Sequence, residues 1–182
     1  MNKKIAAIDI GTNSFHLIVV EVFDDGHFEI VDRVKEVIRL SEGSKGDIKL
    51  ISEEATQRAI GALKKFAGIA NAHNAEIKAV ATSAVRESQN KYEFIERIFD
   101  ETKISIDVIS GVEEGRLIYQ GVLNAVPIFN KRILSIDIGG GSTEFVIGLK
   151  GNILYANSLK LGAVRLTKQF FPDNKVTKSR IG

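Results

Sequence analysis

The sequence contains no cysteine, no tryptophan and only 2 prolines among its 182 residues. The lack of cysteine excludes disulfide bridges, thiolate zinc sites, iron–sulfur clusters and cysteine nucleophiles. Any metal ion must therefore be held by oxygen atoms or by the 3 histidines. Few prolines, with 44% hydrophobic and 26% charged residues, are typical of a globular protein rather than a disordered or fibrous one.

A strong charge of one sign is also missing. The chain has 25 Lys and Arg against 23 Asp and Glu, for a net charge of +2. This excess is too small to attract nucleic acid by bulk charge, so we expect no nucleic-acid partner. No apolar run approaches the roughly 18 residues of a membrane span, and the run after the basic start is broken at Asp9. We therefore expect a cytoplasmic protein without a membrane partner.

Alternating β-rich runs and amphipathic helical patterns predict an α/β fold. Runs at 5–10, 15–23 and 28–38 are separated by turn residues and predict an antiparallel meander. Further expected elements are a loop at 41–50, a helix from Ser52 to about Asn71, a strand at 76–81, a helix at 91–101, a strand at 104–109 and a helix from Ser110 to about Ala125.

One pattern occurs twice. The strand and turn Ile5–Ser14 are echoed by Ile133–Ser142, so that Asp9 corresponds to Asp137. The likeness continues through the next hairpin to Arg39 and Arg165, which indicates two related halves. Pro127 and the charged turn after it combine a helix end with a proline, so we place the domain boundary at 126/127.

The two repeated turns have the composition of phosphate-binding loops. Small residues let main-chain N–H groups approach a phosphate closely, and an Asp at the strand end can hold a hard cation through oxygen. We expect the two turns to face each other across a cleft and to hold a phosphate chain and its metal ion between them. The alternative is a pair of ordinary hairpins in which Asp only caps its own turn.

Five blocks of the sequence, in order, resemble motifs of the exopolyphosphatase/guanosine pentaphosphate phosphatase family, within the actin-like, sugar-kinase and Hsp70-type superfamily. They are Asp9–Ser14, Ala81–Arg86, Ile109–Tyr119, Asp137–Glu144 and Gly162–Leu166. The resemblance implies a duplicated ribonuclease H-like (actin-like ATPase) domain, with the first copy at 1–126. Family members continue far beyond this length, so the second copy, at 127–182, is expected to be truncated after a meander and a first helix at 163–171.

The function implied by the resemblance is that of a phosphoric anhydride hydrolase. Such an enzyme uses Mg²⁺ to release terminal phosphate from inorganic polyphosphate, or to convert guanosine pentaphosphate to the tetraphosphate. Three alternatives stay open. The first is an ATP-dependent kinase or ATPase of the same superfamily, and the second is a non-catalytic polyphosphate- or alarmone-binding protein. The third is a fragment that, on its own, is inactive, homodimeric or poorly soluble.

Glu114 is the candidate catalytic base. The segment Ser110–Glu113 matches a capping box, which occupies Glu113 and leaves Glu114 at the head of an apolar helix face. A partly desolvated carboxylate there is basic enough to take a proton from water. The resemblance implies the same role for this second Glu, whereas the alternative is a glutamate that only stabilises the helix dipole.

The other candidates are phosphate and metal ligands. Arg86 can bind phosphate oxygens in a bidentate manner, although an ion pair with Glu87 is the alternative. The resemblance implies a magnesium role for Asp137 and Glu144, with Asp9 as the equivalent in the first half. The candidate phosphate-binding residues are Gly11, Thr12, Asn13, Ser14, Thr82, Ser83, Arg86, Gly139, Gly140, Gly141 and Ser142.

Overall fold

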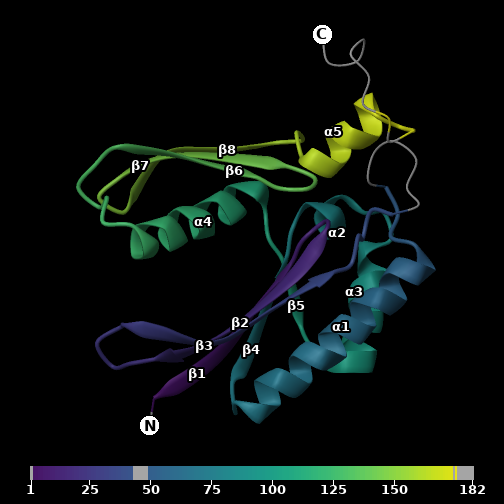
Figure 1. The fold of residues 1–182 in the computed structure, drawn as a ribbon, viewed down its shortest axis with the longest axis horizontal. Coiled ribbons are helices and arrows are strands. Elements are labelled where there is room, and N and C mark those ends of the chain that lie inside the picture. Colours follow the sequence, from purple (N-terminus) through teal and green to yellow (C-terminus); the bar gives the residue numbers. More distant parts are fainter. Residues whose placement is uncertain (1, 43–48, 174, 176–182) are drawn as a thin grey trace. The chain divides into compact units, whose positions relative to one another are not determined.

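The computed structural model describes residues 2–42, 49–173 and 175, so most of the loop expected at 41–50 and the end of the expected second domain lie outside the described residues. The elements are β1 (Lys3–Ile10), β2 (Ser14–Val22), β3 (Phe28–Val37), α1 (Glu53–Ala72), β4 (Glu76–Ala81), α2 (Ser83–Glu87), α3 (Lys91–Thr102), β5 (Ile106–Val108), α4 (Gly111–Ala125), β6 (Ile133–Ile138), β7 (Thr143–Leu149), β8 (Asn152–Leu159) and α5 (Ala163–Phe170) (Figure 1).

The chain forms two compact units, Met1–Val108 and Ile109–Gly182. The division lies earlier than the domain boundary expected at 126/127. It does so because α4 packs on strands that follow it in the sequence, making contacts with β6, β7 and β8. The helix that carries Glu114 therefore shares a compact unit with the second small-residue turn.

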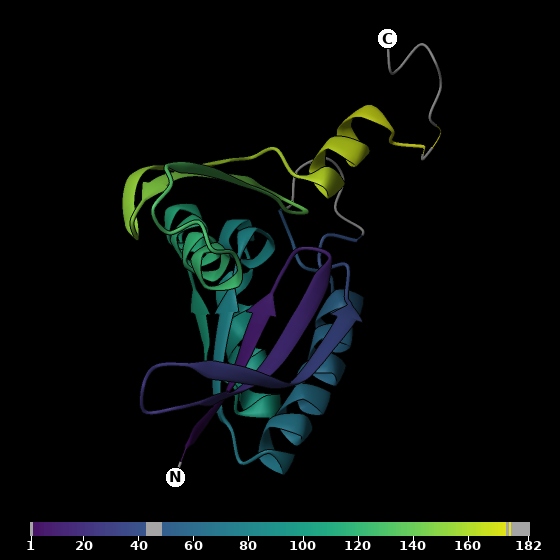
Figure 2. The ribbon, with the colours of Figure 1, turned by 60° about the vertical axis from the view of Figure 1, so that its left-hand side comes forward.

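The first unit contains a five-stranded sheet in the order β3-β2-β1-β4-β5. The antiparallel meander β1–β3 is joined by β4, which pairs in parallel with β1, and by β5, which pairs in parallel with β4. In Figure 2, α1 runs along the strands. Alternate strand residues such as Ile8 and Leu17 form one buried cluster with Leu63 and Phe66 of α1 and Phe94 of α3, so both helices cover the same face.

Helix α1 begins where the sequence predicts. The Ser52 side chain accepts a hydrogen bond from the main-chain N–H of Ala55, and Glu53 and Glu54 occupy the positive first turn. Phe66 is fully buried at the centre of the helix, and burial of a side chain of this size contributes about 1.5–3 kcal/mol. This packing fixes the sheet whose strand ends carry the first turn.

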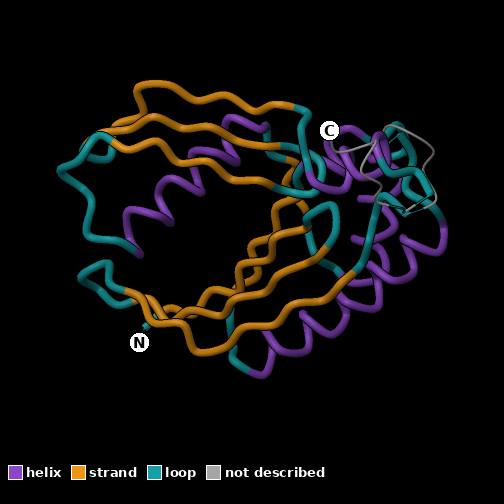
Figure 3. The backbone as a smooth tube through the Cα atoms, turned by 45° about the horizontal axis from the view of Figure 1, so that its top comes forward, coloured by secondary structure: helices purple, strands orange, loops and turns teal. Residues whose placement is uncertain are grey.

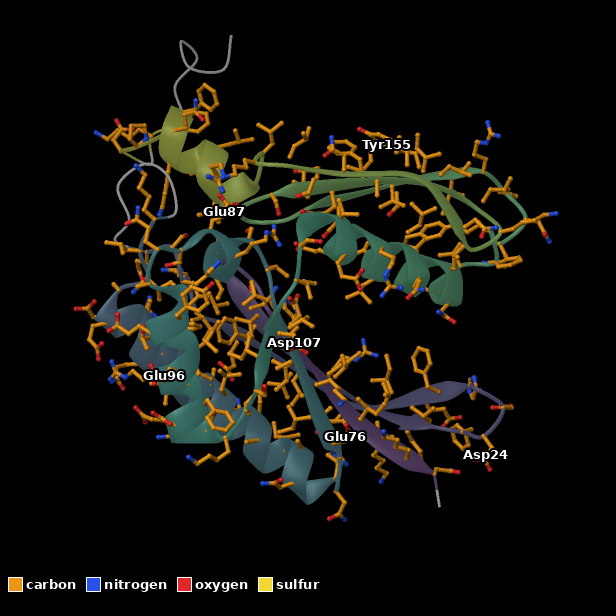
Figure 4. All side chains as sticks on the ribbon, turned by 180° about the vertical axis from the view of Figure 1, so that it is seen from behind. Asp24, Glu76, Glu87, Glu96, Asp107 and Tyr155 are labelled. Atoms are coloured by element: carbon orange, nitrogen blue, oxygen red, sulfur yellow. The ribbon has the colours of Figure 1, made fainter. Side chains whose placement is uncertain are left out.

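The second unit is a three-stranded antiparallel sheet in the order β6-β7-β8, with α4 along one face (Figure 3). Gly115 and Tyr119 are the buried residues of α4. On the other face, Leu134, Ile136 and Tyr155 are more than half exposed, and Figure 4 shows Tyr155 on the side away from α4. The sheet therefore presents exposed apolar side chains on the face that α4 does not cover.

The two meanders share their irregularities as well as their strand order. The pairing shifts between Val19 and Val20 in the first meander and between Ile147 and Gly148 in the second, which are matching positions in the repeat. These matches support the repeat found in the sequence. That the units are copies of one duplicated domain, with a truncated second copy, stays a prediction.

Among the described residues, no helix combines the length and the apolar character needed to cross a membrane.

Candidate active site

The turn at residues 139–142 is held by the start of α5. Three of its carbonyl oxygens accept hydrogen bonds of 2.9 Å: Gly139 O from Ala163 N, Gly140 O from Val164 N, and Gly141 O from the Arg165 Nε. In a planar trans peptide the C=O and the following N–H point in opposite directions. The N–H groups of Gly140, Gly141 and Ser142 are therefore directed away from α5, and successive N–H groups directed to one side suit an anion.

The first turn, at residues 11–14, is held in the same way by the segment after β3. Asn13 O accepts hydrogen bonds of 2.9 Å from the N–H groups of Ile38 and Arg39, and Thr12 O accepts one of 3.0 Å from Leu40 N. The following N–H groups, of Asn13 and Ser14, are consequently directed to the opposite side of the turn. In both repeated turns, carbonyl oxygens thus accept hydrogen bonds from a neighbouring segment, and the following N–H groups are directed away from that segment.

The structure brings the block at 81–86 next to the first turn. Strands β1 and β4 are parallel neighbours and end side by side at Ile10 and Ala81. The hydroxyls of Thr12 and Ser83 lie 2.8 Å apart and are buried, and Thr82 N donates to Ile10 O at 3.2 Å. The Thr12 and Ser83 hydroxyls, expected to bind phosphate, are thus hydrogen-bonded to each other and join the first turn to the start of α2. Arg86 lies half-buried on the same helix.

The two candidate metal ligands of the second unit lie directly opposite each other on neighbouring strands. Asp137 on β6 pairs with Glu144 on β7, and Glu144 pairs in turn with Ser158 on β8. Glu144 is 1% exposed. Its Oε1 accepts a hydrogen bond of 2.7 Å from the Ser158 hydroxyl, whereas its Oε2 has no hydrogen-bond partner within the described part of the chain.

A divalent cation fits this arrangement. Two carboxylates directly opposite each other repel, and a buried carboxylate oxygen without a partner is costly, so a cation beside them would offset both effects. The described residues hold no cluster of three or more His, Cys, Asp or Glu suited to a metal ion. Two carboxylates together with phosphate oxygens and water form a common ligand set for Mg²⁺.

The corresponding row of the first unit has different chemistry. Asp9 on β1 pairs with His16 on β2, which pairs with Lys35 on β3, and all three are exposed. Because the position opposite Asp9 holds a histidine instead of a carboxylate, this row lacks the two facing carboxylates of the second unit. A metal role for Asp9 stays a prediction.

The capping box at the start of α4 is only half formed. The Ser110 hydroxyl accepts a hydrogen bond of 3.1 Å from Glu113 N, as predicted. The Glu113 carboxylate, however, binds Arg116 through Nε at 2.8 Å and through the terminal nitrogen at 2.6 Å, in place of the Ser110 N–H. The Glu113 carboxylate binds the Arg116 guanidinium in preference to the Ser110 N–H because the guanidinium offers two charge-assisted hydrogen bonds. These bonds lower the pKa of Glu113.

Glu114 lies half-buried beside the contact between α4 and β7. A Cβ atom at the neighbouring Gly115 would stand 3.6 Å from the Glu144 Cβ, so the first turn of α4 is held against the strand that carries Glu144. Glu114 is thus next in sequence to Gly115, the residue of α4 that packs against the candidate metal ligand Glu144.

Comparison with known proteins identifies the family. Residues 18–181 match the Ppx/GppA phosphatase family. The chain belongs to this family. Among curated Ppx/GppA relatives, it is 35% identical to Exopolyphosphatase 1 of Mycobacterium leprae, over 98% of this chain and 52% of that protein. It is also 41% identical to the bifunctional 3-dehydroquinate synthase/phosphatase of Fusobacterium nucleatum, over 94% of this chain and 27% of that protein. The family resemblance seen in the sequence is thus confirmed.

Solved structures of the family share the fold. The exopolyphosphatase from Cytophaga hutchinsonii is 41% identical with a TM-score of 0.86, over 93% of this chain and 54% of that one. The Ppx/GppA family member from Aquifex aeolicus is 30% identical with a TM-score of 0.81, over 100% of this chain and 58% of that one. The α/β fold of the Ppx/GppA proteins is thereby confirmed, and the chain spans about half of their length.

Three residues of this region received no role from the sequence. Ser158 is found only through the pairing of β7 with β8. Gly162 and Arg165 lie in a block that resembles the family, but their role in holding the second turn is seen only from their contacts with it. Alternation along β8 is the one sequence signal that could indicate which face Ser158 occupies.

Proposed function

We propose that this chain provides the phosphate- and cation-binding part of a phosphohydrolase that acts on phosphoric anhydrides. Inorganic polyphosphate and guanosine pentaphosphate are the substrate classes. The observation that carries the proposal is that two kinds of binding group occur together in the second unit. Three N–H groups of the second turn are directed away from α5, and Glu144, which is buried opposite Asp137, has a hydrogen bond to only one of its two carboxylate oxygens among the described residues. An anion and a cation are the partners that these groups require.

The chain's own residues have the following roles in this proposal. The N–H groups of the second turn bind the oxygens of a terminal phosphate, and the first turn supplies N–H groups of the same kind. Arg86 offsets charge that develops on the transferred phosphoryl group. That both turns act on one phosphate chain is a prediction that rests on the sequence repeat.

Glu114 acts on the attacking water. Its carboxylate accepts a proton from the water as the oxygen attacks the terminal phosphorus, and the bond from phosphorus to the bridging oxygen breaks. Asp137 and Glu144 would hold Mg²⁺, which neutralises phosphate charge when it is bound. The products are orthophosphate and an anhydride shortened by one phosphate.

The test is phosphate release from three substrates. Long-chain polyphosphate, guanosine pentaphosphate and ATP are compared at equal concentration, with Mg²⁺ and with a chelator. The proposal expects Mg²⁺-dependent release from the first or second substrate in clear excess over ATP. Faster release from ATP would instead indicate an ATPase of the same superfamily.

A binding assay separates catalysis from recognition. Polyphosphate that binds the folded state raises the midpoint of thermal unfolding. If polyphosphate raises this midpoint while no phosphate is released at any Mg²⁺ concentration, the hydrolase proposal is wrong and a phosphate-binding protein is the better description.

A further inference from the structure

We propose that Ser158 is a positioning residue that orients the Glu144 carboxylate toward a divalent cation. This inference rests on the proposed function, because it assigns Glu144 to cation binding. It adds a residue of β8 to a site that the sequence places only on the 137–144 hairpin.

Among the residues that the structure describes, Ser158 is the one hydrogen-bond partner of the Glu144 carboxylate. The Oγ–Oε1 distance is 2.7 Å, in the range of a charge-assisted bond, and Glu144 is 1% exposed. The bond leaves Oε2 as the carboxylate oxygen without a hydrogen-bond partner among the described residues. The two oxygens therefore differ: Ser158 holds Oε1, whereas Oε2 is buried with no hydrogen-bond partner in the described part of the chain, as expected of an oxygen that binds a cation when one is present.

The sheet places Ser158 for this role. Glu144 and Ser158 are directly paired across β7 and β8, and the pairing becomes irregular only further along, between Ile147 and Gly148. Residues that pair across strands lie on one face of a sheet, so Asp137, Glu144 and Ser158 form one row. A hydroxyl at the end of this row can restrict rotation of the central carboxylate without adding a further negative charge.

Physical precedent sets the size of the effect. Carboxylates that bind metal ions are themselves held by hydrogen bonds, and removal of such an outer bond typically weakens metal affinity by about 10–100-fold. Removal of the Ser158 hydroxyl would also leave both oxygens of a buried carboxylate without a partner. A weaker cation complex is therefore expected even though Ser158 does not contact the cation.

The experiment titrates the protein with Mn²⁺ alone and measures the concentration of free Mn²⁺ at each point by electron paramagnetic resonance. Ser158→Thr and Ser158→Val form a matched pair, since both side chains are β-branched and differ only in hydroxyl against methyl. We expect Ser158→Val to weaken Mn²⁺ binding about tenfold, and Ser158→Thr to stay close to the unmodified protein. Ser135→Ala is the control, because Ser135 lies on β6 in register with Val146 instead of Glu144.

A double variant tests the route of the effect. In a Glu144→Gln background, Ser158→Val should weaken Mn²⁺ binding no further, since the group that Ser158 positions has been removed. Equal affinities of the Val and Thr variants would overturn the inference while leaving the proposed function intact. Absence of Mn²⁺ binding by the unmodified protein would also overturn it, and the separate assay of phosphate release then decides whether the function stands.

Discussion

The ring of Tyr119 on α4 lies directly against the backbone of Gly148 on β7. A Cβ atom at position 148 would stand 2.3 Å from the Tyr119 Cζ and 2.4 Å from its hydroxyl oxygen. Tyr119 is fully buried, and its hydroxyl has no hydrogen-bond partner among the described residues. The close approach of α4 to the sheet therefore depends on the absence of a side chain at Gly148.

The first prediction is that Gly148→Ala destabilises the second unit. The added methyl must displace the buried ring of Tyr119, and overpacking of this kind typically costs about 1–3 kcal/mol. Urea unfolding followed by circular dichroism measures the change in the free energy of unfolding. The control is Gly121→Ala on α4, where a Cβ atom has open space, so the gain in helix propensity should stabilise the protein by up to about 1 kcal/mol. Similar effects of the two variants would contradict the packing described here.

The second prediction concerns the contact between α5 and the second turn. In Gly162→Ala, the new Cβ would lie 2.3 Å from Gly140 O, which is backbone and cannot rotate away. We expect the start of α5 to shift, so that the N–H groups of Ala163 and Val164 lose their hydrogen bonds to the turn and exchange faster with solvent. Hydrogen exchange followed by NMR measures these rates. The N–H groups of Ile38 and Arg39 make the matching bonds to the first turn and serve as the internal control.

The third prediction tests the catalytic base. Glu114→Gln should fold and bind polyphosphate normally but release phosphate at least about 100-fold more slowly, since a general base typically contributes 10²–10⁴-fold. Glu113→Gln is the matched control on the adjacent residue, because Glu113 is bound to Arg116 and has no role in the proposed chemistry. Near-normal turnover by Glu114→Gln would remove the proposed role of this residue.

The fourth prediction concerns stability at low pH. Lys3 and Lys78 bind the Glu76 carboxylate and lower its pKa from 4.5 to about 2. Because the pKa is lower in the folded state, these contacts stabilise the protein above pH 4.5 and are lost as the pH falls toward 2. The difference in unfolding free energy between the protein and Glu76→Gln should therefore shrink over that interval. The pairs are exposed, so 1 M NaCl should reduce the difference at pH 6 as well.

Local patterns in the sequence are sufficient to predict most of the elements. The strand at 76–81 is found at its predicted bounds, and the helices at α1, α3 and α4 begin within a residue of their predicted starts. Caps account for the starts of α1 and α4, since Ser52 and Ser110 each accept a main-chain hydrogen bond in the first turn. The first meander is likewise predicted by its three β-rich runs and the turn residues between them, and the second meander by its likeness to the first.

Features that depend on contacts between distant residues could not be predicted in this way. The partner of Glu113 is decided by a competition between the Ser110 N–H and the Arg116 guanidinium, which a capping pattern does not contain. The role of Ser158 depends on the register of β7 with β8. The packing of α4 depends on Gly148, which the sequence presents only as a small residue within a strand.

The buried position of Tyr119 also has a practical use. The chain has 3 tyrosines and no tryptophan, and the other two, Tyr92 and Tyr155, are 76% and 53% exposed. Fluorine-labelled tyrosine should therefore give one resonance that is insensitive to a soluble paramagnetic quencher and two that are broadened by it. The protected signal would report the docking of α4 in real time, without the substitution of any residue.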